Sequence, residues 1–342
     1  MNALLRLVLA SAVFGVGFLV ASADDSAVRP GKVAPKPLFR DPVYDGAADP
    51  TVIYNRAEKK WFMFYTNRRA SLTNGVDGVS WVHGTKIGIA ESGDGGATWT
   101  YRGTADITYG GDGMTHWAPE VIAHDGLYHM FLTFVPGIFS NWQHPRDIIH
   151  LTSTNLLQWK YESTLELSAD RVIDPCVCQL PDDTWRMWYN NERDGKSIYY
   201  ADSKDLHHWE DKGKAAGTSE RGGEGPKVFQ WKDHYWMAVD IWDGIRIYRS
   251  DDALHWQRGP EDLVKTPGRG TDDGVKGGHP DVVVNGDRAY MFYFTHPGRS
   301  GGARGDAYAQ RRSSIQVVEL EVKDGWITCD RDQPTRIQLA AP

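Results

Sequence analysis

Three acidic residues lie directly before a proline or two residues before one: Asp49, Asp174 and Glu224. Carboxyl groups acting together are well suited to general acid–base catalysis, in which one removes a proton and another supplies one. Like charges held close together raise the pKa of at least one member, and acids with perturbed pKa values concentrate in catalytic sites. If the fold brings these three residues together, the sequence predicts acid–base chemistry. Taken singly, each acid is also suited to capping a strand or binding a central ion.

The proline belongs to a pattern that occurs five times. Each copy continues as two runs rich in aromatic and β-branched residues, separated by a short polar or glycine-bearing turn, and this predicts a β-hairpin. The five copies begin at Asp49-Pro50, Ala118-Pro119, Asp174-Pro175, Gly225-Pro226 and His279-Pro280. Repetition at a period of about 50 to 70 residues is typical of solenoids and propellers.

A second hairpin follows in the first four copies. Its first strand ends at a serine, and a tryptophan comes six or seven residues later; the pairs are Ser92 and Trp99, Ser153 and Trp159, Ser203 and Trp209, and Ser250 and Trp256. The fifth copy closes differently, with residues 315–322 and 326–329. Four-stranded units in this number predict an all-β fold, a five-bladed β-propeller with four antiparallel strands per blade, over residues 38–342. An open β-sandwich would not repeat both the hairpin pair and its signature.

Propeller geometry places the chemical groups. The first strand of each blade lines the central channel, and all five inner strands run the same way. We therefore expect each shared proline to begin an inner strand, where no ladder partner is needed. Its neighbours should meet at one mouth of the channel: Asp49, Ala118, Glu120, Asp174, Glu224 and His279. The second strand returns to that mouth, so its last residues should form the rim: residues 67–69, 190–192, 240–242 and 295–296, among them Asn67, Arg68, Asn190, Trp242 and His296.

These motifs resemble glycoside hydrolase family 43. The likeness is carried by Asp49-Pro50, by Trp117-Ala-Pro-Glu120, by Ile173-Asp174-Pro175 and by Gly223-Glu224-Gly-Pro226, in this order, and it covers the whole chain after its first residues. The wider group of similar five-bladed proteins includes fructosidases, mannoside phosphorylases and 3,6-anhydro-galactosidases. Glu120 stands where aspartate is commoner in the family, and the rim matches none of its substrate subgroups.

The resemblance implies a role for each mouth residue. Asp49 would be the general base, Glu224 the general acid, and Asp174 the residue that orients Glu224 and keeps it protonated. His279 would lie beside a structural calcium ion or a water in the channel, and no cofactor would be required. Trp117, Glu120, Asn67, Arg68, Asn190, Trp242, His279 and His296 are the expected substrate-binding residues.

The function expected on these grounds is an inverting, exo-acting glycoside hydrolase. Its substrate would be a plant, algal or microbial polysaccharide or oligosaccharide, cleaved in the manner of an arabinofuranosidase, xylosidase or galactosidase. Alternatives are an anhydro-galactosidase or a glycoside phosphorylase of a related family, and a non-catalytic carbohydrate-binding propeller. A sialidase is less well supported, because no inner-strand start offers the arginines that such a site needs.

The first residues predict export. A basic residue within the first six, an apolar run from Leu7 to Val20 and the small residues Ala21-Ser22-Ala23 are typical of a cleaved signal peptide, residues 1–23; a membrane anchor is the alternative. Residues 24–37 read as a proline-containing arm. We therefore expect a secreted or periplasmic protein that leaves the membrane once the signal is removed. The chain has 38 basic and 45 acidic residues without a long basic stripe, so nucleic acid is not an expected partner.

Two further features are left open by the sequence. Of three cysteines, Cys176 and Cys178 are too close for a relaxed bridge to each other, so either could pair only with Cys329, and free buried thiols are favoured. Residues 298–312 interrupt the fifth blade with several glycines and with Arg299, Arg304, Arg311 and Arg312. This insertion should rise on the active-site side. It could bind an anionic sugar, reach a neighbouring subunit to form an oligomer, or be a solvated loop.

Overall fold

A computed structural model describes residues 31–218, 222–303 and 305–342. The predicted signal peptide and Arg304 lie outside the described residues. Within them, no helix has both the length and the apolar character needed to cross a bilayer.

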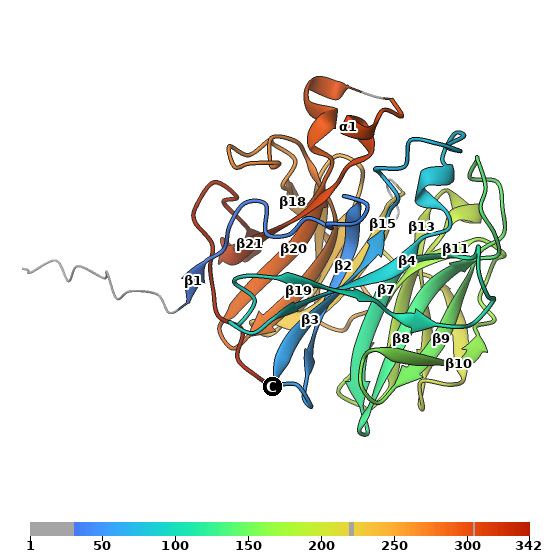
Figure 1. Ribbon diagram of the computed structural model, residues 1–342. Helices are drawn as coiled ribbons and strands as arrows, with labels where there is room; N and C mark the ends of the chain where they lie inside the picture. Colours follow the sequence, from blue (N-terminus) through green and yellow to red (C-terminus); the bar gives the residue numbers. More distant parts are fainter. Residues whose placement is uncertain (1–30, 219–221, 304) are drawn as a thin grey trace, which may run out of the picture.

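Five antiparallel sheets are formed in chain order, as predicted (Figure 1). Each sheet is one blade in which sequential strands are neighbours. The blades are β2 (Ala47–Asn55), β3 (Lys60–Asn67), β4 (Lys86–Ser92) and β5 (Thr100–Thr104); β7 (Thr115–His124), β8 (Leu127–Val135), β9 (Asp147–Ser153) and β10 (Gln158–Thr164); β11 (Val172–Gln179), β12 (Trp185–Asn191), β13 (Ser197–Ser203) and β14 (Trp209–Lys214); β15 (Glu224–Trp231), β16 (His234–Asp240), β17 (Ile245–Ser250) and β18 (Gln257–Leu263); and β19 (Gly277–Asn285), β20 (Arg288–Thr295), β21 (Ser314–Lys323) and β22 (Trp326–Thr328). A short strand, β6 (Asp106–Ile107), adds to the outer edge of the second blade.

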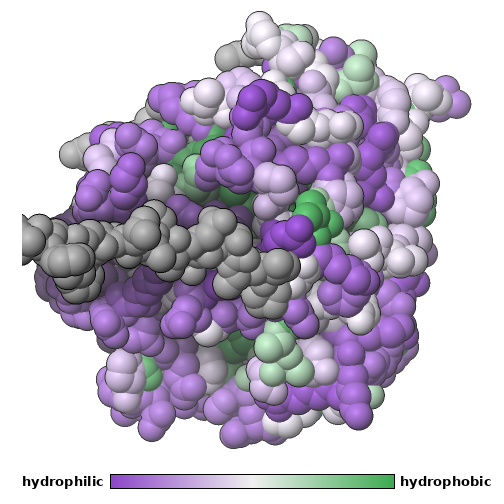
Figure 2. All heavy atoms as spheres, turned by 90° about the vertical axis from the view of Figure 1, so that its left-hand side faces the viewer, coloured by the Kyte–Doolittle hydropathy of each residue, from purple (hydrophilic) through white to green (hydrophobic). Residues whose placement is uncertain are grey.

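The core lies between the blades. Each inner strand contacts the inner strands of both neighbouring blades, so β2, β7, β11, β15 and β19 form a closed ring. One buried apolar cluster fills each of the five interfaces between blades. Burying one large apolar side chain contributes about 1.5–3 kcal/mol, so these clusters hold the ring together. On the face shown in Figure 2, hydrophilic residues predominate and apolar residues gather only in small, separate groups.

The shared proline lies inside each inner strand and does not begin it, contrary to the expectation from the sequence. The pairing register shifts at the proline in all five blades, which marks a β-bulge. The residue before the proline has a positive φ in every blade: 51° at Asp49, 45° at Ala118, 59° at Asp174, 56° at Gly225 and 40° at His279. A bulge leaves one residue unpaired, so the missing N–H of proline removes no ladder bond. Left-handed backbone at residues other than glycine is strained, and such strain concentrates at functional sites.

Backbone N–H groups freed by the bulges bind side chains of the preceding blade. The N–H of Ala118 donates to Thr66 Oγ1 at 2.8 Å, that of Asp174 to Thr133 Oγ1 at 3.0 Å, and that of His279 to Asp240 Oδ2 at 2.9 Å. Each acceptor lies near the end of the second strand of its blade. These bonds satisfy buried donors and fix the position of each bulge relative to the next blade.

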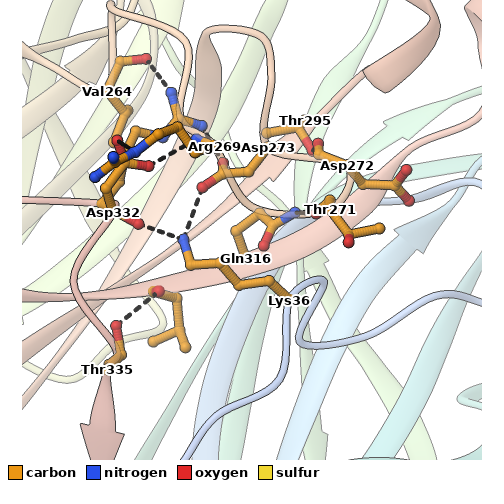
Figure 3. Close-up of polar contacts among 12 residues, drawn as sticks. Lys36, Val264, Arg269, Thr271, Asp272, Asp273, Thr295, Gln316, Asp332 and Thr335 are labelled. Carbon is orange, nitrogen blue, oxygen red and sulfur yellow. Dashed lines mark hydrogen bonds and ion pairs between the residues drawn. The ribbon is translucent and has the colours of Figure 1, made fainter.

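Both ends of the described chain meet where the fifth blade joins the first. β1 (Lys32–Val33) pairs with β23 (Arg336–Ile337), and Leu38 N–H donates to Ile315 O at 2.9 Å. Residues 32–37, expected to be an unpatterned arm, are therefore held by the propeller. Beside them, Asp273 is fully buried and accepts from Lys36 Nζ at 2.7 Å (Figure 3). It also accepts from Arg331 and from the Tyr293 hydroxyl.

Replacing Asp273 with Ala should strongly destabilise the fold. The substitution leaves Arg331 and Lys36 without their shared carboxylate, and breaking a buried ion pair from one side costs about 3–5 kcal/mol. Urea unfolding measures the change. Asp332→Ala is the matched control: Asp332 pairs with the exposed Arg269 at 3.0 Å, so its loss should cost about 1 kcal/mol or less. Equal losses in the two variants would contradict this role for Asp273.

Candidate active site

A cavity of about 560 Å³ opens at the mouth of the channel. Eight of the side chains predicted from the sequence line it: Asp49, Arg68, Trp117, Asp174, Glu224, Trp242, His279 and His296. The three acids come from blades one, three and four, far apart along the chain. The structure therefore brings together the groups on which the prediction of acid–base chemistry depends.

Three predicted residues do not reach the cavity. Asn67 is buried and donates to Asp41 Oδ2 at 3.0 Å, and Asn190 is buried and donates to the carbonyl oxygen of Gly223. Successive side chains of a strand point to opposite faces, so each asparagine and the residue that follows it cannot both face the substrate. These two residues bind backbone and side chains within the fold. The expectation that they contact sugar is not supported by their positions.

Glu120, the third, belongs to a second layer below the cavity floor. Its carboxylate accepts from Lys227 Nζ at 2.9 and 3.0 Å, and Lys227 also pairs with Asp281 at 2.7 Å. Thr51 and Cys176 occupy the equivalent place in their own blades, two residues after the bulge, and are buried. Thr51 Oγ1 also lies 3.5 Å from Glu120 Oε2, so Thr51, Glu120, Lys227 and Asp281 form one contact network on the inner strands. Glu120 is therefore a partner of a buried ammonium group and lies away from the substrate side.

Asp49 is paired with a cation. Arg68 Nη2 donates to its two carboxylate oxygens at 2.8 and 3.0 Å, and His279 Nδ1 lies 3.5 Å from Oδ1. Burial alone would raise the pKa of Asp49, but Arg68 and His279 together hold it below its usual value. Asp49 is thus ionised at neutral pH, and a carboxylate of this kind can accept a proton.

Two other carboxyl groups have the opposite character. Burial raises the pKa of Asp174 to about 7, with Glu224 and Asp49 adding to the rise and His279 opposing it. Burial and the nearby Glu224 raise the pKa of Asp240 to about 7 as well. Asp174 accepts from the Gly225 N–H at 3.0 Å, so it contacts the backbone next to Glu224. This half of the site retains a proton near neutral pH.

Glu224 itself is bound by a lysine that the sequence analysis did not identify. Lys196 Nζ lies 2.8 Å from Glu224 Oε2 and 5.0 Å from the centre of the Trp242 ring. Burial would raise the pKa of Glu224, but Lys196 and a hydrogen bond from Trp242 lower it. We expected Asp174 to keep Glu224 protonated; in the structure the proton is favoured on Asp174 and Asp240.

Several charged residues that were not selected as site residues from the sequence also lie at the cavity. Arg146, Arg171, Glu192 and Lys196 all line it, and Asp240 lies beside Glu224 in the ladder. Asp240 and Glu192 lie in the segments expected on the rim, but neither was chosen as a substrate-binding residue. The other three lie next to strand ends, where the blade repeat does not predict which way a side chain points.

The insertion of the fifth blade stands beside the cavity, as expected. Its two short helical segments are Pro297–Gly302 and α1 (Tyr308–Arg311), at the top of Figure 1. Arg299 lines the main cavity and an adjoining one of about 370 Å³. Arg311 instead donates to Leu72 O at 2.7 Å, and Arg312 pairs with Asp45 and Asp272. The segment is therefore packed onto the propeller, and Arg299 is its one described arginine that lines a cavity.

Neither a disulfide nor a ready metal site is found. The three cysteines are free thiols, as favoured, but only Cys176 is buried, whereas Cys178 and Cys329 are partly exposed. The described residues contain no group of three or more histidine, cysteine or carboxylate side chains placed to hold a metal ion. Near the channel axis, the carboxylates of Glu120 and Asp281 contact the ammonium group of Lys227. The residues present thus do not fit the calcium site that the resemblance implies.

The propeller and the three carboxyl groups that share its cavity are those expected of a glycosidase. Residues 40–268 match the model of a family related to glycoside hydrolase family 43, described as "Probable glycosyl hydrolase domain". The chain belongs to this family and is a glycoside hydrolase. The matched segment contains Asp49, Asp174 and Glu224, whereas the fifth blade with His279 lies beyond it.

Solved structures share the fold at low sequence identity. A thermostable family 43 glycoside hydrolase is 19% identical, with a TM-score of 0.65 and coverage of 89% of this chain and 99% of that one. A family 43 β-1,3-galactosidase with galactodeoxynojirimycin is 15% identical (TM-score 0.59; 87% and 97% covered). A family 43 enzyme from Xanthomonas citri complexed with xylotriose is 16% identical (TM-score 0.60; 88% and 94% covered). No curated protein matches the sequence.

Proposed function

We propose that the protein is an inverting, exo-acting glycoside hydrolase in which Asp49 is the general base and Glu224 the general acid. The observation that carries the proposal is the division of the site. Arg68 keeps Asp49 ionised, while Asp174 and Asp240, the carboxyl groups beside Glu224, have pKa values raised to about 7 and hold a proton next to the proposed acid. Carboxyl groups whose environments drive their pKa values apart are the mark of an acid–base pair.

In the proposed reaction, Asp49 takes a proton from a water molecule as the water oxygen bonds to the anomeric carbon. Glu224 gives its proton to the glycosidic oxygen as the bond from that oxygen to the anomeric carbon breaks. Asp174 orients Glu224 through the Gly225 N–H, and its raised pKa keeps a proton in this part of the site. An inverting pair needs about 6.5–9.5 Å between the carboxyl groups to admit the water.

Exo action is supported by the closed channel. The layer of Lys227, Glu120 and Asp281 fills the channel below the acids, so a glycan chain cannot pass through it and the site suits a chain end. At the mouth, Trp242 and Trp142 keep 37% and 48% of their surface exposed and offer faces for sugar rings. A screen of arabinan, xylan, galactan, agar and mannan oligosaccharides by chromatography tests the proposal. Release of single terminal sugars supports it, and binding without cleavage would favour the carbohydrate-binding alternative.

The pH profile should be bell-shaped. Asp49 has a lowered pKa, so activity should fall only when the pH drops below the usual aspartate range, about 4. Asp174 and Asp240, beside the proposed acid, have pKa values of about 7. The value of kcat/KM should therefore fall as the pH rises through 7 and these groups lose their proton. Arg68→Met removes the cation beside Asp49 and should move the acid limb to higher pH. An acid limb that stays in place would contradict the role of this pair.

We further propose that stability does not depend on calcium, because Lys227 supplies the positive charge between Glu120 and Asp281. Thermal unfolding should occur at the same temperature in EDTA and in millimolar calcium. In Lys227→Met the two carboxylates lose their cation, so the protein should be destabilised and calcium should restore part of the loss. A calcium-dependent melting temperature in the unsubstituted protein would refute the proposal. Export to the periplasm or medium remains a prediction from residues 1–23.

A further inference from the structure

One wall of the cavity carries more positive than negative charge. Glu192 has a buried carboxylate around which three cations gather: Arg146 Nε at 2.6 Å, Lys196 Nζ at 3.2 Å and Arg171 Nε at 4.0 Å. We call Arg146, Arg171 and Lys196 the cationic wall. Lys196 has a second partner in Glu224, so the wall sets three cations against two carboxylates, both already in contact with it.

Within the wall, Arg171 is the cation least compensated by its neighbours. Its Nη1 donates to the neutral side chain of Gln143 at 3.0 Å, and its ion pair with Glu192 is the long one of the three. Arg146, in contrast, is buried, is in close contact with Glu192, and donates to Trp142 O at 2.5 Å. Arg171 lines the cavity, and its guanidinium can donate two parallel hydrogen bonds to an anion such as a carboxylate or a sulfate.

The net charge of the whole cavity lining is also positive near neutral pH. Its lining contains five carboxylates (Asp49, Asp174, Glu192, Glu224, Asp240) and five arginine or lysine side chains (Arg68, Arg146, Arg171, Lys196, Arg299). Because Asp174 and Asp240 have pKa values of about 7, they carry a proton for part of the time at neutral pH, and the balance becomes positive. A neutral sugar would leave this excess uncompensated in a partly desolvated site.

We propose, on the basis of the proposed hydrolase function, that Arg171 and Lys196 bind an anionic group, a carboxylate or a sulfate ester, on the sugar next to the scissile bond. The location follows from Lys196, which contacts the proposed acid Glu224 and so lies on the leaving-group side. An anion there draws Lys196 away from Glu224 and leaves Glu224 free to take up the proton that it must donate. The cation paired with Asp49 is Arg68, whereas the ion pairs of the wall are with Glu192 and Glu224, so the wall is poorly placed to hold a phosphate ion that would attack in place of water.

Matched substrate pairs test the proposal. One pair is an oligosaccharide whose second sugar from the non-reducing end is a uronic acid, and the same oligosaccharide after carboxyl reduction; the other is an oligosaccharide with a sulfate ester on that second sugar, and its desulfated form. We expect kcat/KM to be at least about tenfold higher for the anionic member of one pair, and the pair that shows this identifies the anion. Arg171→Gln should lower kcat/KM about tenfold more for that member than for its neutral partner. Arg193→Gln is the control, because Arg193 pairs outside the cavity with the exposed Asp170 and should leave both values unchanged.

Binding measurements separate this proposal from the proposed function. Calorimetry with glucuronate, galacturonate and galactose 6-sulfate, against glucose and galactose, needs no turnover. We expect at least one anionic sugar to bind about tenfold more tightly than its neutral counterpart, and Arg171→Gln to remove most of the difference. Equal affinities, a difference that persists in Arg171→Gln, or phosphate-dependent release of a sugar phosphate would overturn the proposal. If no glycan is cleaved but the difference in affinity is found, the anion site stands and the hydrolase assignment fails.

Discussion

Glu224→Gln should lower kcat by on the order of 10²–10⁴-fold on natural glycosides, because glutamine cannot donate the proton that the leaving oxygen needs. The loss should be much smaller on aryl glycosides whose leaving group is already a weak base, since such a group departs without protonation. Steady-state kinetics on both substrate types measures the difference. Asp243→Asn is a suitable control: Asp243 is a rim aspartate that pairs with Lys265 at 3.0 Å and does not line the main cavity. Equal losses on both substrate types would contradict the role of Glu224 as acid.

Asp49→Asn should reduce kcat by a similar factor, on the order of 10²–10⁴-fold. Unlike the loss in Glu224→Gln, this loss should not depend on the leaving group. Asparagine keeps the shape and can still face Arg68, yet it cannot take a proton from water. The two variants thus distinguish base from acid by their dependence on the leaving group. Circular dichroism and thermal unfolding should show a folded protein in each case. A variant that keeps activity on natural substrates would exclude Asp49 as the base.

The five-bladed fold could be predicted because the same hairpin and proline recur in every blade, and one local pattern in five copies leaves few architectures. The position of the proline within the strand could not be predicted from the sequence. A strand start and a β-bulge both leave an N–H without a ladder partner, so proline suits either. The positive φ at Asp49, Asp174 and His279 decides the matter, and backbone torsions of this kind are set by contacts between blades.

The candidate site, like the fold, could be predicted from the sequence only where the residues belong to the repeated pattern. Asp49, Asp174 and His279 occupy one repeated position, so the repeat alone placed them together. Asn67 and Asn190 were assigned to the rim from strand direction, but side-chain alternation turns them inward. The cationic wall stands next to strand ends and in loops that differ between blades, so no repeated pattern marked it. The charge on Glu224 therefore depends on Lys196, which sequence reasoning did not identify.

The central claim is that Asp49 and Glu224 act from opposite sides of one sugar, with a water between the sugar and Asp49. Proton NMR of the first anomer released, recorded before mutarotation, tests it most directly. Inversion of the anomeric configuration is the predicted result. Release of a sugar with retained configuration would mean that a covalent intermediate forms, and it would contradict the account.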